Sequence, residues 1–206
     1  MKVIIVAKTK MRDSHCIGGI AWNKKFLRLL DENGNNFSER NPFEIGQIWD
    51  MEFTNVNNVI APHTEDVLIQ SKSYTNEKYS REELSKLIQH NFSNRIWRGN
   101  PKRLFNGLIN FTTSGVGYIS KSNLTNYSVG FWIPDQELIR RTENEKVRYN
   151  YVENPRWKNI PYVGTDETIR RIPQDTLIRV SLARWWSYDS NTEERCYLQL
   201  SGWYID

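Results

Sequence analysis

Residues 177–186 read LIRVSLARWW, and residues 195–204 read RCYLQLSGWY, with a polar stretch between them. Both segments alternate in polarity and are rich in β-branched and aromatic residues, which is typical of strands. Successive side chains of a strand point to opposite faces. The two segments therefore predict a C-terminal β-hairpin that carries large rings on both of its faces.

One face of this hairpin is mostly apolar and is predicted to face a core. Its members are Ile178, Val180, Leu182, Arg184 and Trp186 on the first strand, and Cys196, Leu198, Leu200, Gly202 and Tyr204 on the second. The opposite, outer face is mixed. Its members are Leu177, Arg179, Ser181, Ala183 and Trp185, followed by Arg195, Tyr197, Gln199, Ser201 and Trp203. A bulge between Ala183 and Trp186 would exchange the faces of Trp185 and Trp186.

The outer face has the chemistry of a ligand-binding surface. Aromatic rings stack on nucleic-acid bases, Gln and Ser bond to base edges, and Arg meets phosphate. The alternative is that this face docks against the first barrel or the connector, because Tyr and Trp are also common at such contacts. Both interpretations stay open. The candidate ligand contacts are Arg179, Ser181, Arg184, Trp185, Tyr197, Gln199, Ser201 and Trp203, with help from Arg95, Trp97 and Arg98.

Further strand patterns surround the hairpin at both ends of the chain. The N-terminal part contains KVIIVAKTK, CIGGIAW, FLRLL, IGQIWDMEFT and DVLIQSKSY, and the C-terminal part adds YSVGFWI, KVRYNYV and KNIPYVG. Each part has the length of one small five-stranded barrel of the OB type. The predicted fold is mainly β, with two small OB-like β-barrels, at residues 1–75 and 126–206, joined by a short helical connector at 76–125.

The predicted connector is helical and basic. Ser80 and Glu83 form a capping-box pattern ahead of apolar residues at helical spacing, and a second short helix is expected after Asn100. Residues 72–103 hold eight Lys or Arg and three Glu, a difference of +5 that exceeds the net charge of +4 for all 206 residues. Such a stretch either attracts phosphates or is a solvated surface.

The composition limits the classes of function. With 13% aromatic residues and eight tryptophans the chain is expected to fold. Two cysteines, Cys16 and Cys196, allow neither a disulfide framework nor a four-cysteine zinc site. The start is apolar for only a few residues and no run is long enough to span a bilayer, so a cytoplasmic protein without membrane contact is expected. We expect no cofactor and no resident metal.

Several of these segments resemble the dual OB-containing domain family of bacteria. The similarity is strongest in YVGTDETIRRIPQDTLIRVSLARWW and ERCYLQLSGWY, and extends to Cys16-Ile17-Gly18-Gly19-Ile20 and Pro62-His63-Thr64-Glu65-Asp66. Phe26-Leu27-Arg28-Leu29 stands where the family often has Trp-Ile-Arg-Pro, so the chain departs from the family there. The resemblance implies two OB-like barrels and a role in nucleic-acid or nucleotide recognition.

The expected function is a non-enzymatic binding module for single-stranded nucleic acid or a nucleotide-like ligand. A protein-interaction or accessory subunit, as in a bacterial defence system, is the alternative. A third hypothesis is a metal-dependent hydrolase or nuclease that uses His63, Glu65 and Asp66. His15 precedes Cys16 directly, but neighbouring strand residues face opposite ways, so no nucleophile–base pair is expected there.

Overall fold

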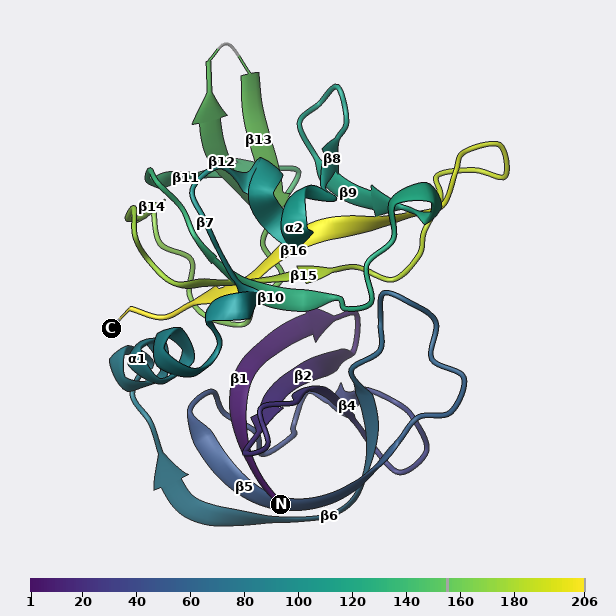
Figure 1. Cartoon of the computed structure of the whole chain (residues 1–206), viewed down its shortest axis with the longest axis vertical. Helices are drawn as coiled ribbons and strands as arrows, with labels where there is room; N and C mark the ends of the chain where they lie inside the picture. The colour runs from purple at the N-terminus through teal and green to yellow at the C-terminus, as the bar shows by residue number, and fades with distance from the viewer. Residues whose placement is uncertain (155, 206) are drawn as a thin grey trace.

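The N-terminal half of the chain forms a closed five-stranded barrel. A computed structural model describes residues 1–154 and 156–205, and places this barrel below a second β-rich body in Figure 1. The strands pair in the order β1-β5-β6-β3-β2, and β1 also pairs with β2, which closes the barrel; the short β4 extends β2. Their bounds are β1 Lys2–Met11, β2 Ser14–Ala21, β3 Phe26–Leu30, β4 Phe37–Ser38, β5 Gln47–Asn55 and β6 Asp66–Lys78.

The interior of this barrel is filled by one face of each strand, as the alternating sequence predicts. On β5, Trp49 and Met51 are buried inside, while Asp50 and Glu52, which alternate with them, are exposed. Phe43 enters from the loop before β5 and packs edge-on against Trp49, with ring centroids 4.9 Å apart. Because every strand has a paired neighbour on both sides, the barrel leaves no free sheet edge among β1, β2, β3, β5 and β6.

The second body consists of two sheets around their own core. A six-stranded sheet has the order β7-β10-β15-β16-β9-β8, and a four-stranded sheet has the order β13-β12-β11-β14. Their shared core includes Trp132, Tyr149, Ile178, Leu198 and Trp203. The bounds are β7 Ile96–Arg98, β8 Asn110–Phe111, β9 Gly117–Ser120, β10 Val129–Ile133, β11 Leu138–Glu143, β12 Lys146–Glu153, β13 Arg156–Pro161, β14 Arg171–Ile172, β15 Ile178–Leu182 and β16 Arg195–Trp203.

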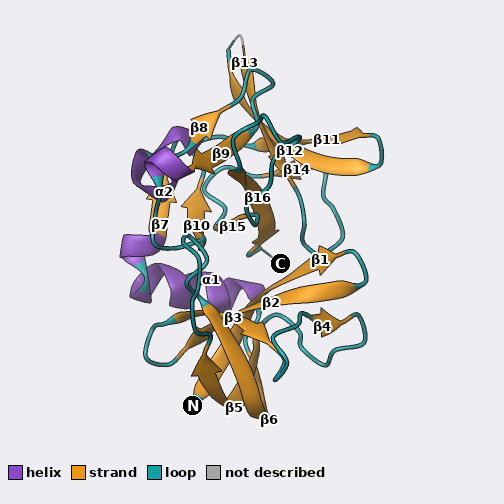
Figure 2. Cartoon of the chain, turned by 90° about the vertical axis from the view of Figure 1, so that its right-hand side faces the viewer, coloured by secondary structure: helices purple, strands orange, loops and turns teal. Residues whose placement is uncertain are grey.

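A third apolar cluster joins the two bodies. The outer surface of the barrel contributes Ile4 and Ile48, the second body contributes Phe131 and Tyr204, and helix α1 (Arg81–Asn91) covers them with Leu84 and Ile88. Figure 2 shows α1 lying across the junction. The helix starts as predicted, because Ser80 and Glu83 form a complete capping box. The two bodies are therefore packed together through a hydrophobic core.

The middle segment contains more than helices. Besides α1 and α2 (Leu104–Gly107), it supplies β7, β8 and β9 to the six-stranded sheet. Residues 117–120, in a segment rich in Gly, Ser and Thr, form a strand beside β16. Strand β7 pairs in parallel with β10, a long-range pairing that three residues of local sequence do not encode. Division into domains at residues 75 and 126 stays a prediction. In the described part of the chain, no helix is long and apolar enough to cross a membrane.

Candidate functional site

A register shift in the C-terminal hairpin decides which aromatic rings are buried. Val180 pairs with Leu200 but Arg179 pairs with Gly202, so Ser201 is an extra residue on β16. The bulge turns Trp203 to the core, where it is 6% exposed, although the alternating pattern placed it on the outer face. Tyr204 is buried as expected, but in the cluster between the two bodies.

The two neighbouring tryptophans also differ from the predicted faces. Strand β15 ends at Leu182, before the pair. Trp185 is partly buried and donates from Nε1 to the carbonyl oxygen of Ala61 at 2.9 Å. Trp186, expected in the core, is 53% exposed and forms an isolated bridge to Arg195. Alternation fails here because it holds only while the chain remains a regular strand.

Part of the outer face of the hairpin docks against the first barrel. Arg179 and Ser201 are buried, Ser181 and Gln199 are partly buried, and the hydroxyl groups of Ser181 and Ser201 lie 2.7 Å apart. Arg179, Ser181 and Gln199 line a cavity of about 70 Å³ together with groups from β1, β2 and β3. We call this space the arginine cavity, since its lining includes Arg28, Arg179 and Arg184.

The segment before β6 connects the two bodies through polar contacts. Asp66 pairs with Arg28 of the barrel at 2.7 Å and with Arg184 of the second body at 2.5 Å. The carboxylate of Glu65 accepts hydrogen bonds from the backbone N–H and the hydroxyl of Ser128, both at 2.8 Å. His63 Nε2 lies 3.1 Å from the carbonyl oxygen of Ala183. These contacts give all three residues of the hydrolase hypothesis a structural role.

Burial sets the protonation of this segment. Desolvation, and after it the charges of Arg184 and Arg28, lowers the pKa of His63 to about 4. Desolvation also raises the pKa of Glu65 above its ordinary value. Within residues 1–154 and 156–205, no group of three or more His, Cys, Asp or Glu side chains is arranged to hold a metal ion. Nothing in the segment supports metal chemistry.

The cysteines are no better placed for catalysis. Burial raises the pKa of Cys196 to about 12, so its thiol is a poor nucleophile. Cys16 lines the arginine cavity, while the Nδ1 atom of His15 lies 3.1 Å from Nδ2 of Asn41. The expectation that His15 does not activate Cys16 agrees with this geometry.

The three candidates in the middle segment do not join the hairpin residues. Trp97 is 7% exposed and donates from Nε1 to Asn106 at 3.0 Å. The guanidinium of Arg95 lies 3.8 Å from the ring centroid of Tyr127, and burial lowers its pKa. Arg98 is exposed, with a 3.4 Å bond to Gln89. Several cations of the basic stretch are already paired with carboxylates of the protein. These are Lys78, Arg81, Lys86 and Lys102.

A row of aromatic side chains lies on the surface near the hairpin end. Ring centroids are 6.3 Å apart for Tyr118 and Tyr197, 5.9 Å for Tyr197 and Trp186, and 6.3 Å for Trp186 and Tyr188. We call these four residues the aromatic strip. Trp186 is 53% exposed and Tyr188 is 82% exposed. The loop between β15 and β16 that carries them projects from the side of the second body (Figure 1).

Cations accompany the aromatic strip. The guanidinium of Arg195 lies 4.1 Å from the centroid of Tyr118, and Lys121 Nζ lies 5.7 Å from the centroid of Trp185. Tyr197 was a candidate contact from the sequence, whereas Tyr118, Tyr188 and Lys121 were not among the candidates. The paired tryptophans at the end of a strand are the one signal that points to this surface.

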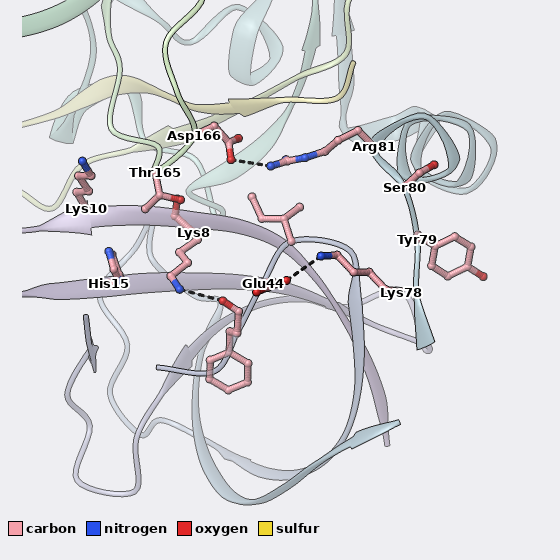
Figure 3. Close-up of a pocket in the computed structure, with 12 residues that line it drawn as sticks. Lys8, Lys10, His15, Glu44, Lys78, Tyr79, Ser80, Arg81, Thr165 and Asp166 are labelled. Carbon is pink, nitrogen blue, oxygen red and sulfur yellow. Dashed lines mark hydrogen bonds and ion pairs between the residues drawn. The ribbon is translucent and has the colours of Figure 1, made fainter. Parts of the chain in front are cut away.

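A larger pocket lies elsewhere, between the barrel and the second body (Figure 3). It has a volume of about 610 Å³ and a basic lining. Lys8 donates to the carbonyl oxygen of Phe43 at 2.9 Å, Lys78 pairs with Glu44 at 2.7 Å, and Arg81 pairs with Asp166 at 2.7 Å. Because these cations already have protein partners, the size of the pocket does not make it the strongest candidate.

A closed β-barrel joined to a second β body, with an exposed aromatic surface, defines a double-barrel protein of the OB type. Residues 1–203 match the model of the dual OB-containing domain, and the chain belongs to that family. The predicted mainly β, OB-like fold class and the family resemblance are thereby confirmed. No curated protein matches the chain. A solved structure, the crystal structure of the p204 HINb domain, matches 97% of this chain and 95% of its own length, with 12% identity and a TM-score of 0.35.

Proposed function

We propose that this protein is a non-enzymatic binding module for single-stranded nucleic acid, and that the aromatic strip contacts the bases. The observation that carries the proposal is the contact of four rings in series on an exposed surface, with cations beside them. A row of rings flanked by basic side chains is the common arrangement of proteins that bind single strands without strong sequence preference.

The strip is energetically suited to bind bases. Each base that stacks on an aromatic side chain contributes roughly 1–3 kcal/mol, because every base has an apolar face. Trp186 and Tyr188 keep most of their surface in water and are not needed to fill a core. Two or three stacked bases would therefore supply enough free energy for micromolar binding, once the backbone phosphates are also contacted.

The phosphate contacts would come from Arg195, Lys121 and Arg184. Lys121 is paired with Glu194 at 2.6 Å, but both side chains are about half exposed, so that pair contributes little and is readily exchanged for a phosphate. Each phosphate neutralised releases counterions, so affinity is expected to fall as salt rises, with a slope near −0.7 per contact for a single strand. Three contacts would give a slope of about −2.

A fluorescence-anisotropy titration with labelled single-stranded DNA and RNA tests the proposal. Trp186→Ala is expected to weaken binding roughly 5- to 100-fold, the equivalent of one lost stacking contact. Trp157→Ala is the matched control, because Trp157 on β13 is also 53% exposed but lies outside the strip. Absence of binding at low salt, or equal losses in the two variants, would contradict the proposal.

The alternative is that the strip binds a protein, as an accessory subunit of a defence system would. Tyr and Trp are enriched at protein interfaces too. The cations at the strip favour the nucleic acid, because interface centres are depleted in charge. A protein partner would displace labelled oligonucleotide only if both bound the aromatic strip. Oligonucleotide binding that Trp186→Ala weakens would therefore favour the nucleic-acid function over the protein-interaction function.

A further inference from the structure

Arg179 is a buried cation without a counter-charge. It lies on β15, is 6% exposed, and forms no ion pair with any residue that the structure describes. Its Nε atom is buried and has no hydrogen-bond partner among those residues. An uncompensated buried charge costs several kcal/mol, so such a group normally has an anion beside it.

A glycine on the first barrel makes room for this cation. A Cβ atom at Gly18 would lie 2.6 Å from Nη2 and 3.0 Å from Cζ of Arg179. Any side chain at position 18 would therefore push the guanidinium away from the backbone of β2. The position holds the guanidinium at the wall of the arginine cavity, which both residues line.

The surroundings of Arg179 do not neutralise it. Arg28 and Arg184 line the same cavity, and both already share the single carboxylate of Asp66. Glu65 is occupied by Ser128. Three guanidinium groups thus line the cavity, together with the polar side chains of Thr9, Ser181 and Gln199, and the carboxylate of Asp66 lies outside this lining. Planar guanidinium forks and hydroxyl donors are the groups that hold phosphate in proteins.

The size of the cavity limits what can enter. A volume of about 70 Å³ compares with roughly 10–15 Å³ for each water-sized group. That is room for about five such groups, which is the number of heavy atoms in a phosphate. A phosphodiester within a strand would need space for nucleosides on both of its sides. The volume therefore favours a phosphate at the end of a ligand.

The cavity and the aromatic strip are neighbours on one strand. Every second residue of β16 lies on the same face, and Arg195, Tyr197 and Gln199 share one face. Tyr197 belongs to the aromatic strip, while Gln199 lines the arginine cavity. Two residues along a strand span about 7 Å. Met11 and Arg184 at the cavity are exposed, at 41% and, for the side chain of Arg184, 43%. A base on Tyr197 and a phosphate in the cavity would therefore be adjacent parts of one ligand.

We propose that the arginine cavity binds a terminal phosphate, so that the protein recognises the phosphorylated end of a single strand. This inference rests on the proposed function, the binding of single-stranded nucleic acid, and adds that the bound strand ends in a phosphate. A terminal phosphate carries a charge of about −1.5 to −2 at neutral pH, more than an internal phosphodiester, and meets the unpaired charge of Arg179.

Inorganic phosphate tests the cavity alone. Thermal unfolding of the full chain is followed as phosphate replaces acetate at constant ionic strength. The Tm is expected to rise with phosphate concentration and then to saturate. Phosphorus NMR should show line broadening over the same range. Chloride at equal ionic strength is the comparison. A rise with chloride as large as with phosphate, or no saturable rise at all, would overturn the phosphate assignment.

Arg179→Met locates the effect. Methionine fills a similar volume without charge, and removal of an unpaired buried charge leaves no orphaned partner, so the variant is expected to fold with unchanged or higher stability. It should lose the response to phosphate. Arg141→Met, at an exposed arginine on β11, is the matched control and should keep it. Gly18→Ala gives a second check that keeps the charge but displaces the guanidinium. A phosphate response retained by Arg179→Met and Gly18→Ala would overturn the inference.

Oligonucleotides of one sequence with a 5′-phosphate, a 3′-phosphate or two hydroxyl ends test the strand end. We expect the unaltered protein to prefer one phosphorylated form by at least about 10-fold, and Arg179→Met to abolish the preference. Binding without any preference, and without a phosphate response, would refute the inference and leave the proposed function standing. A phosphate response without strand binding would refute the proposed function and leave only the assignment of a phosphate to the cavity. Trp186→Ala should weaken strand binding while it keeps the phosphate response.

Discussion

The hydroxyl of Tyr204 donates a 2.6 Å hydrogen bond to the carbonyl oxygen of Val6, and so joins the end of the last strand to the first. Both groups are buried between the barrel and the second body, where the Tyr204 ring also contacts Phe131 at a centroid distance of 5.8 Å. The arginine cavity lies at the same junction and has walls from both bodies. The relative position of the bodies therefore determines whether the cavity forms.

Tyr204→Phe should destabilise the protein by about 1–3 kcal/mol, because the ring remains but the buried carbonyl of Val6 loses its partner. Urea unfolding measures the change. Tyr188→Phe removes a hydroxyl from a side chain that is 82% exposed, and should shift the free energy of unfolding by less than about 0.5 kcal/mol. Equal effects of the two substitutions would show that the Val6 contact does not hold the bodies together.

Asp66→Asn should be costlier, because one carboxylate serves both Arg28 and Arg184. Loss of the charge leaves two guanidiniums without an anion. The cost is expected to be about 2–4 kcal/mol, at the lower end because the Arg184 side chain is 43% exposed. Glu82→Gln breaks the exposed surface pair with Lys86 and should leave the free energy of unfolding nearly unchanged. If phosphate enters the arginine cavity, it should stabilise Asp66→Asn more than the unaltered protein.

His63 predicts a loss of stability in mild acid. Its pKa of about 4 lies below the ordinary value of 6.5, so the unfolded chain binds the proton first. The contribution is fully present above pH 6.5 and is lost as the pH falls towards 4. It amounts to roughly 3 kcal/mol, at 1.36 kcal/mol per pKa unit. The raised pKa of Glu65 acts in the opposite direction, because there the folded state holds the proton more tightly.

Comparison with His63→Gln isolates this contribution from that of Glu65. Chemical unfolding at several values between pH 6.5 and 4 should give a smaller fall in stability for the variant than for the unaltered protein. His90→Gln, at an exposed histidine in α1, is the matched substitution for comparison. A slope that does not respond to His63→Gln would place the pH dependence elsewhere.

Local sequence predicted those elements whose signals are local. The capping box at Ser80 located the start of α1, and alternation in β5 placed Trp49 and Met51 inside the barrel. The predicted faces of Trp186 and Trp203 were wrong for two reasons. A single extra residue at Ser201 reverses the alternation ahead of Trp203, and no residue type marks it. Strand β15 ends at Leu182, so alternation no longer applies at Trp186. Alternation along a strand also does not predict which residues of the two bodies pack against each other.

The arginine cavity shows why the site is harder to predict than the fold. Arg179 was among the candidate contacts of the sequence, and that role stays a prediction. A glycine inside a strand, such as Gly18, is compatible with a bulge, a sharp bend or the close approach of another group. Gly18 leaves space for the guanidinium of Arg179, but the two residues are 161 positions apart in the sequence. They meet only because their strands pack across the interface between the two bodies. Tertiary structure alone brings them together.

Gly130 and Trp97 form a similar pair inside the second body. A Cβ atom at Gly130 would lie 2.5 Å from Cη2 of Trp97, and the ring cannot shift freely, because it packs against Phe105 and bonds to Asn106. Gly130→Ala should therefore cost about 1–3 kcal/mol through overpacking, measured by urea unfolding.

A double-mutant cycle shows whether the ring is the cause. In a Trp97→Leu background the smaller side chain leaves space for the new methyl group, so Gly130→Ala should cost much less than in the unaltered protein, with a coupling energy of about 1–3 kcal/mol. Equal costs in the two backgrounds would mean that backbone strain in β10, and not the tryptophan, excludes a side chain. Neither variant touches the aromatic strip. Gly130→Ala should therefore still bind single-stranded nucleic acid under conditions where the variant is folded. That result would show that Trp97 acts as a core residue and not as the ligand contact that the sequence led us to expect.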